Sequence, residues 1–150
     1  MNNAAKPRIL LVEDDLTVQN LVSTALDLHG YVVSKVCNGQ AAIMDAVSHG
    51  PSLIMLDLGL PDIDGIEVIT KIRSWSAVPI IVISARTEDS DKIAALDAGA
   101  DDYLTKPFRL GELRARVAAH LRRQHRTPQH RFRRGGLDFD LGEKAVYWGE

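Results

Sequence analysis

The sequence has 150 residues, of which 45% are hydrophobic and 25% are charged, so we expect one packed domain with a short appendage rather than a disordered chain. No apolar run approaches the ~18 residues that a membrane helix needs, and the first residues lack the apolar segment of a secretory signal. The single cysteine, Cys37, excludes a disulfide bond within the chain. Together these features predict a cytoplasmic protein that does not interact with membranes.

The formal net charge of −2 conceals an uneven distribution along the chain. Residues 113–137 contain eight arginines and no acid, whereas residues 138–150 contain four acids and one lysine. The segment before residue 113 is acidic overall. An acidic body that is followed by a basic stretch suggests two separate tasks on one chain.

Short apolar runs alternate with segments of helical periodicity from about residue 8 onwards. The run at 8–12 predicts a buried strand, and the apolar residues after it recur at helical spacing until Gly30: Val18, Leu21, Val22, Ala25 and Leu26. Further strands are predicted at 31–36, 53–56, 79–83 and 102–105. Further helices are predicted at 39–49, around Ile66, Ile69 and Ile72, near 88–98, and around Leu110, Leu113, Val117 and Leu121.

Nearly continuous apolar strands separated by amphipathic helices favour a parallel sheet that is covered on both faces. The pattern therefore predicts an α/β fold of the flavodoxin-like, doubly wound kind, with five parallel strands in the order 2-1-3-4-5 and five helices. We assign residues 7–124 to this domain.

The pattern changes after residue 124. Residues 125–136 are polar and rich in arginine, and they contain Pro128 and a pair of glycines, which indicates a linker. Residues 137–141 alternate with a period of two, 142–144 resemble a turn, and 145–148 are apolar again, which indicates a β-hairpin. Because a hairpin of this size does not fold alone, we expect 137–150 to be the truncated start of a second domain.

Polar residues follow four of the five predicted strands: Glu13, Asp14 and Asp15 after the first, Asp57 after the third, Ser84 after the fourth and Lys106 after the fifth. In an open parallel sheet, ligands bind outside the carboxyl ends of the strands, where the strand order reverses. For the order 2-1-3-4-5 this point lies between the first and third strands. We therefore expect Asp14 and Asp57 to lie side by side.

This set of residues suits a phosphate and a divalent cation. Crowded carboxylates repel one another at neutral pH, and an all-oxygen set of ligands suits Mg²⁺ better than Zn²⁺. The ammonium of Lys106 would offset the charge of a phosphoryl group, and the hydroxyl of Ser84 would donate to one of its oxygens. A single acid after a strand is more often a helix cap, and this is the interpretation we prefer for Asp15.

Several motifs together resemble the receiver domain of response regulators of the OmpR/PhoB class. They are VEDD at 12–15, LDLGLPD at 56–62, SAR at 84–86 and GADDYLTKPF at 99–108. The resemblance covers residues 7–124. Within this class, the segments 75–79 and 90–104 are especially similar to regulators of potassium-transport genes.

The resemblance implies a role for each matching residue of the site. Asp57 would accept a phosphoryl group from the phosphohistidine of a sensor histidine kinase. Asp14, Asp57 and the backbone carbonyl of Gly59 would ligate Mg²⁺, and Glu13 would act through a water molecule. The domain would thus be a phosphoacceptor that promotes its own modification, rather than a conventional enzyme.

The same resemblance implies a conformational switch. Ser84 and Lys106 would hold the phosphoryl oxygens, and Tyr103 would turn inward when the Ser84 hydroxyl moves to the phosphate. The peptide bond between residues 106 and 107 is usually cis in this family. Phosphorylation would then shift a two-state equilibrium in the region of the fourth helix and fifth strand.

The expected result of this switch is a symmetric dimer through the fourth helix, fifth strand and fifth helix. Two pairs of residues match those that join the protomers in this class: Lys92 with Glu112, and either Asp101 or Asp102 with Arg116. A third pair would join Asp97 to a lysine on the last helix, but the matching position is Ala118. DNA would be bound by a winged-helix domain whose recognition helix lies beyond residue 150.

Two other functions remain open at this point. The chain would also suit a stand-alone receiver that acts through protein partners. An aspartyl-phosphate phosphohydrolase of the haloacid dehalogenase type needs a second acid two residues after its nucleophile, and Gly59 occupies that position. The phosphohydrolase is therefore the weaker alternative.

Overall fold

The computed structural model describes residues 6–126. Five parallel strands form one sheet: β1 (Arg8–Val12), β2 (Val32–Val36), β3 (Leu53–Leu56), β4 (Ile80–Ser84) and β5 (Asp102–Thr105). Their order is β2-β1-β3-β4-β5, which confirms the predicted topology. The predicted linker beyond residue 126 and the predicted hairpin at 137–150 lie outside the described residues.

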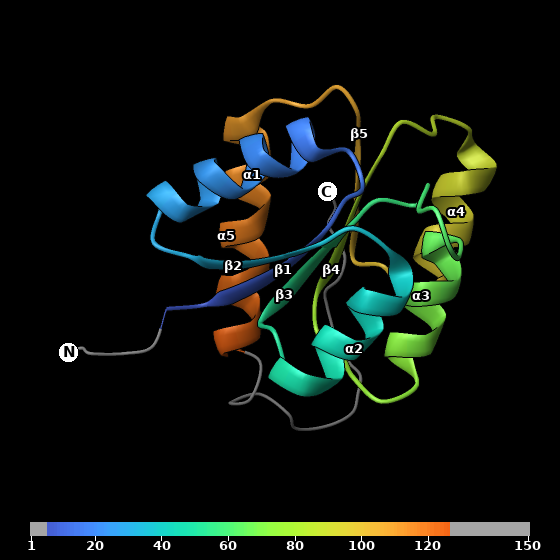
Figure 1. The fold of residues 1–150 in the computed structure, drawn as a ribbon, viewed down its shortest axis with the longest axis horizontal. Coiled ribbons are helices and arrows are strands. Elements are labelled where there is room, and N and C mark those ends of the chain that lie inside the picture. Colours follow the sequence, from blue (N-terminus) through green and yellow to red (C-terminus); the bar gives the residue numbers. More distant parts are fainter. Residues whose placement is uncertain (1–5, 127–150) are drawn as a thin grey trace.

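Five helices connect and cover the strands: α1 (Leu16–Leu28), α2 (Gly39–His49), α3 (Gly65–Arg73), α4 (Asp89–Ala98) and α5 (Leu110–Arg126). Helices α1 and α5 cover one face of the sheet, and α2, α3 and α4 cover the other (Figure 1). None of the helices within residues 6–126 is both long enough and apolar enough to cross a membrane.

The alternation of side chains along the strands divides the core into two clusters. In β1, Leu10 and Val12 belong to the cluster under α2, α3 and α4, whereas Ile9 and Leu11 belong to the cluster under α1 and α5. All residues of β3 and β4 are buried. Strands that are buried on both faces have no polar side, which is why they appeared as continuous apolar runs in the sequence.

Short polar side chains begin three of the helices. The carboxylate of Asp15 accepts hydrogen bonds from the backbone N–H of Thr17 and of Val18, which confirms Asp15 as the N-cap of α1. Asn38 caps α2 and Asp64 caps α3 in the same way. Gly30 follows α1 with φ +89°, a left-handed conformation that favours glycine, in agreement with the predicted end of this helix.

The element boundaries differ from the prediction in three places. Strand β2 begins at Val32 rather than at residue 31, and β4 spans Ile80–Ser84 rather than 79–83. Pro79 has no N–H with which to join the ladder of β4. Helix α5 continues to Arg126, two residues into the range expected for the linker.

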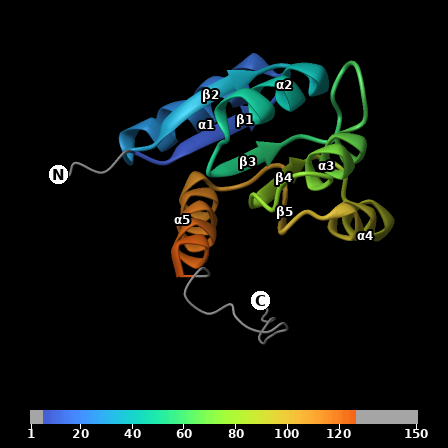
Figure 2. The same cartoon turned by 90° about the horizontal axis from the view of Figure 1, so that it is seen from below.

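Helix α4 is the helix that is least embedded in the core. Ala95 is its only buried residue, and its N-cap Glu88 makes no side-chain capping bond. Ile93 and Leu96 are about half exposed, at 57% and 47%. Figure 2 shows α4 beside α3 at one end of the molecule.

Candidate functional site

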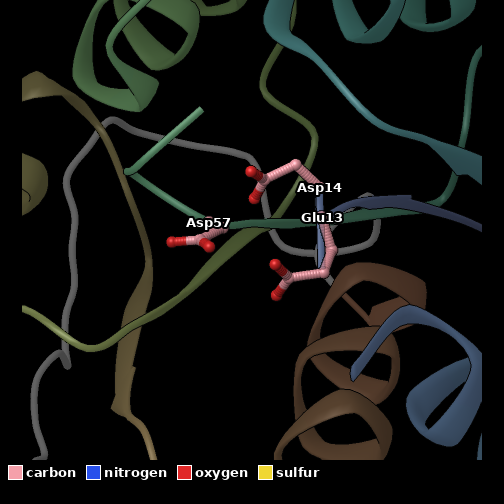
Figure 3. Close-up of side chains that lie close together, drawn as sticks. All are labelled: Glu13, Asp14 and Asp57. Atoms are coloured by element: carbon pink, nitrogen blue, oxygen red, sulfur yellow. The ribbon is translucent and has the colours of Figure 1, made fainter. Parts of the chain in front are cut away.

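Three carboxylates meet where β1 and β3 end. The two strands are parallel neighbours with Val12 opposite Leu56, so the residues after them lie at the same edge of the sheet. The backbone N–H of Asp57 donates to the carbonyl oxygen of Val12 at 3.0 Å. Glu13, Asp14 and Asp57 each place one carboxylate oxygen within 4.8 Å of the other two (Figure 3). The expected proximity of Asp14 and Asp57 is thus present.

The ammonium of Lys106 lies among these carboxylates. Its Nζ is 3.0 Å from Oδ2 of Asp57 and 2.8 Å from Oε1 of Glu13. Burial disfavours the ammonium, but the bonds to the two carboxylates outweigh this effect and raise the pKa of Lys106. The backbone N–H of Lys106 donates to the carbonyl oxygen of Ser84, which fixes the loop after β5, and the bond to Pro107 is cis as expected.

Glu13 is the innermost of the three acids, because its side chain is completely buried. This burial raises the pKa of Glu13, although the ammonium of Lys106 and the N–H of Asp15 act in the opposite direction. The N–H of Asp15 donates to Oε2 of Glu13 at 3.1 Å. Asp57 is also buried, whereas Asp14 is exposed at the mouth of the site.

Lys106 is the single cation of residues 6–123 in ion-pair contact with these acids. Three carboxylates against one ammonium leave an excess of negative charge, which a divalent cation would neutralise. Carboxylate oxygens are hard ligands of the kind that Mg²⁺ prefers. The acidic cluster therefore fits a magnesium site by charge and by ligand chemistry.

Ser84 and Tyr103 both contact the backbone of Arg86. The N–H of Arg86 donates to Oγ of Ser84 at 3.1 Å, and the hydroxyl of Tyr103 donates to the carbonyl oxygen of Arg86 at 2.9 Å. The ammonium of Lys92 lies 5.9 Å from the centre of the Tyr103 ring. The Ser84 hydroxyl thus faces its own loop, close to the site but held by the backbone.

The residues expected at a dimer face contact one another within the chain. Arg116 donates from Nη1 to Oδ1 of Asp102 at 2.7 Å and from Nη2 to Oε2 of Glu112 at 3.0 Å. Within one chain, Arg116 contacts Asp102, whereas Asp101 contacts Arg73. Lys92 lies over the Tyr103 ring. The pairing of Lys92 with Glu112, and of Asp101 or Asp102 with Arg116, between two protomers stays a prediction.

Asp101 takes part in a different arrangement, which sequence reasoning missed. Arg73, at the end of α3, donates from Nη2 to Oδ2 of Asp101, from Nε to the carbonyl oxygen of Gly99 and from Nη1 to that of Ser76. The same Asp101 oxygen accepts the N–H of Ile80. Asp101 and Arg73 therefore fix the turn between α4 and β5.

Three further residues make polar contacts that were not predicted. Gln19 is buried and donates from Nε2 to the carbonyl oxygens of Glu13 and Val36, so it holds the loop that bears the acids. Asp62 accepts the N–H groups of Gly39 and Gln40, which lower its pKa. His120 is buried against Asp102. Gln19 and His120 could have been found from the sequence, because each is a polar residue on the side of a predicted helix that faces the core.

Comparison with known proteins defines the class of the chain. The sequence matches the response regulator receiver domain family over residues 9–118. The chain belongs to this family. Solved structures agree: a two-component response regulator from Clostridium difficile superposes with a TM-score of 0.77 at 34% identity, covering 79% of this chain and 98% of that one. The BeF3-activated N-terminal receiver domain of Klebsiella pneumoniae RstA gives a TM-score of 0.74 at 32% identity over 77% of this chain and 98% of that one.

Two transcriptional regulatory proteins match this chain over most of its length. The chain is 49% identical over 144 residues to the KDP operon transcriptional regulatory protein KdpE of Escherichia coli (strain K12), covering 95% of this chain and 64% of the relative. It is 43% identical over 141 residues to the transcriptional regulatory protein KdpE of Staphylococcus aureus (strain NCTC 8325 / PS 47), covering 93% and 61%. These matches confirm the resemblance to response regulators of the OmpR/PhoB class. The chain spans less than two thirds of the length of these relatives.

Proposed function

We propose that this chain accepts a phosphoryl group on Asp57 in a Mg²⁺-dependent reaction, with a sensor histidine kinase as the donor. The observation that supports this most directly is the contact between Oδ2 of Asp57 and the ammonium of Lys106, beside two further carboxylates. A nucleophilic oxygen, a fixed positive charge and a cluster of hard oxygen ligands are the groups that phosphoryl transfer to a carboxylate needs.

Asp14 and Asp57, with the backbone carbonyl of Gly59, are the proposed ligands of Mg²⁺, and Glu13 is the proposed ligand through a water molecule. When bound, the cation supplies positive charge next to the phosphoryl oxygens. Glu13 is completely buried and already contacts Lys106, which supports an indirect role for its carboxylate. The N–H of Gly59 donates to Oδ1 of Asp57 at 3.2 Å, so the backbone of this loop also orients the nucleophile.

In the proposed reaction, a carboxylate oxygen of Asp57 forms a bond to phosphorus while the bond from phosphorus to the kinase histidine nitrogen breaks, and that nitrogen keeps the electron pair. The product is an acyl phosphate. Lys106 offsets the charge on the transferred group, and Ser84 donates its hydroxyl proton in a hydrogen bond to a phosphoryl oxygen. The chain is the phosphoacceptor in this reaction and not a conventional enzyme.

The hydrogen bonds of Ser84 and Tyr103 support a switch that follows phosphorylation. For the Ser84 hydroxyl to reach the phosphoryl group, it has to leave the N–H of Arg86. Tyr103 then leaves the carbonyl oxygen of the same residue and turns inward. We propose that this change shifts the chain to a two-fold dimer through α4, β5 and α5, with these residues on the contact face: Lys92, Asp101, Asp102, Glu112 and Arg116.

We propose that the whole protein controls transcription, of potassium-transport genes by its similarity to KdpE, through a DNA-binding part that lies beyond these 150 residues. The similarity to the KdpE relatives, which are named as transcriptional regulators, supports this proposal. The same similarity favours a role as a transcription regulator over a role as a stand-alone receiver that acts through protein partners.

The test of the phosphoacceptor is phosphorylation by a small-molecule phosphodonor with and without Mg²⁺, followed by mass mapping of the modified residue. We expect one phosphoryl group on Asp57, formed only when Mg²⁺ is present, and none in Asp57→Asn. Asp62→Asn is the matched control, because Asp62 belongs to the same loop and caps α2. Modification of another residue at the normal rate in Asp57→Asn would contradict the proposal.

A further inference from the structure

Helix α5 presents three polar side chains on one face. Glu112, Arg116 and His120 are spaced by four residues and therefore lie one above another along the helix. Opposite them, at the start of β5, is Asp102. These four residues form a line of contacts that runs from the exposed Glu112 to the buried His120, and we call it the α5 polar row.

The carboxylate of Asp102 is held from two sides in this row. Its Oδ1 accepts Nη1 of Arg116 at 2.7 Å, and its Oδ2 lies 3.1 Å from Nε2 of His120. An ionised carboxylate only accepts hydrogen bonds, so Nε2 of His120 carries the hydrogen and donates it. Each oxygen of Asp102 thus has its own donor from α5.

His120 occupies a position that the helical pattern assigns to the core. Leu113, Val117 and Leu121 on the same side of α5 are buried in the apolar cluster under α1 and α5, and His120 is only 8% exposed. An aliphatic side chain would suit this position. A buried polar ring costs free energy unless it is hydrogen-bonded, and the contact with Asp102 provides that bond.

Asp102 is the acid in hydrogen-bond contact with His120. Asp101 contacts Arg73, β3 has no ionisable residue, and α1 has only Asp27, which is exposed. Burial of Asp102 disfavours its charge, but the hydrogen bonds from His120 and Arg116 outweigh burial and lower the pKa of this carboxyl group. His120 therefore helps to keep Asp102 ionised in a half-buried place.

We propose that His120 is a positioning residue that fixes the Asp102 carboxylate, so that Arg116 is presented in one orientation on the α4, β5 and α5 face. This inference rests on the dimer proposed above. Arg116 is 40% exposed and is oriented by Asp102 and Glu112. If Asp102 were free to rotate, the guanidinium would have to be ordered during association, which weakens binding.

The test compares His120→Leu with His120→Gln in the chain loaded with beryllofluoride and Mg²⁺. Leucine fills the core position but has no hydrogen-bond donor for Asp102. Glutamine keeps a donor, its Nε2, at a similar distance from the backbone. Analytical ultracentrifugation gives the dimer dissociation constant, and urea denaturation gives the fold stability of each variant.

We expect His120→Leu to weaken the dimer about fivefold to tenfold, since Arg116 then has to be ordered during association in each of two protomers, while urea denaturation still shows a folded variant. His120→Gln should stay within about twofold of the original dimer constant. A leucine variant that dimerises normally, or a glutamine variant as weak as the leucine variant, overturns the role of His120. If the loaded original chain stays monomeric, the proposed dimer itself fails and this inference with it.

Discussion

Tyr103 donates its hydroxyl to the backbone carbonyl of Arg86 at 2.9 Å, and this bond links β5 to the loop after β4. The N–H of the same Arg86 holds the Ser84 hydroxyl. One loop residue therefore holds both side chains, which we propose to form a switch, in the arrangement of this structure. Any state in which Ser84 and Tyr103 turn to the site has to break both bonds.

The first prediction concerns this loop. Tyr103→Phe removes the bond to Arg86 and should raise the free energy of the present arrangement by about 1 kcal/mol, the usual net contribution of one hydrogen bond. We therefore expect beryllofluoride to bind about fivefold more tightly, as measured by titration calorimetry in the presence of Mg²⁺. Tyr31→Phe, at a half-buried position away from the site, is the control. Unchanged or weaker binding in Tyr103→Phe would show that the bond does not oppose the switch.

The second prediction concerns the cation. Asp14→Asn removes a proposed ligand, and we expect Mg²⁺ affinity to fall about tenfold or more in titration calorimetry. Asp15→Asn is a close control, because asparagine also caps helices and Asp15 serves as the N-cap of α1. Chelation of Mg²⁺ should stop phosphorylation of the original chain. Equal affinities of the original chain and Asp14→Asn would place the cation elsewhere.

The third prediction concerns Lys106. Lys106→Met leaves the buried carboxylates of Glu13 and Asp57 without their cation, and we expect a loss of roughly 3 kcal/mol of unfolding free energy near pH 8. The loss should shrink towards acidic pH, because Glu13 already has a raised pKa and takes up a proton more readily once the ammonium is gone. Urea denaturation at several pH values measures both effects, with the exposed Lys35→Met as control. A loss no larger than that of the control would mean that water solvates this pair of acids.

The fourth prediction concerns the pH dependence of the Asp102 cluster. The pKa of Asp102 in the folded chain lies below its ordinary value of 3.8, so folding favours the ionised form. Its contribution to stability is complete above pH 3.8 and is lost as the pH falls through the folded pKa. Between pH 5 and pH 7, Asp102→Asn should thus have a free energy of unfolding about 1 to 2 kcal/mol below that of the original chain. We expect a value near the lower limit, because Arg116 is partly exposed.

The difference between Asp102→Asn and the original chain should shrink as the pH falls below 3.8. Urea denaturation between pH 2 and pH 7 measures this trend. Asp97→Asn, an exposed acid on α4, should show little difference at any pH. A constant difference across the whole range would assign the effect of Asp102→Asn to packing rather than to charge.

The fold and the position of the site were predictable because both depend on local patterns. The apolar runs at 8–12 and 53–56 are strands that are buried on both faces, and parallel pairing brings the polar residues after them to one edge. One apolar residue at helical spacing, Leu21, is not buried in the core. It lies on the apolar side of α1 but is 54% exposed, because the sheet covers less of the helix than the apolar residues occupy.

The contacts that join distant loops were not predictable from patterns of this kind. Arg73 reaches Asp101 across 28 positions, and Asp62 caps a helix that begins 23 residues earlier. Such contacts depend on how two loops meet in space, which no local periodicity encodes. For the same reason, the sequence did not show that Arg73 contacts Asp101 while Arg116 contacts Asp102 within the chain.

The shallow attachment of α4 has a consequence for how the domain opens. Because only Ala95 of this helix is buried, lifting or shifting α4 exposes little apolar surface to water, and its opening free energy should lie well below that of the central strands. Amide hydrogen exchange should thus proceed faster in α4 than in β3 or β4, without global unfolding. We therefore expect the loss of the two hydrogen bonds at Arg86 to change the conformations of this helix more than those of the central strands.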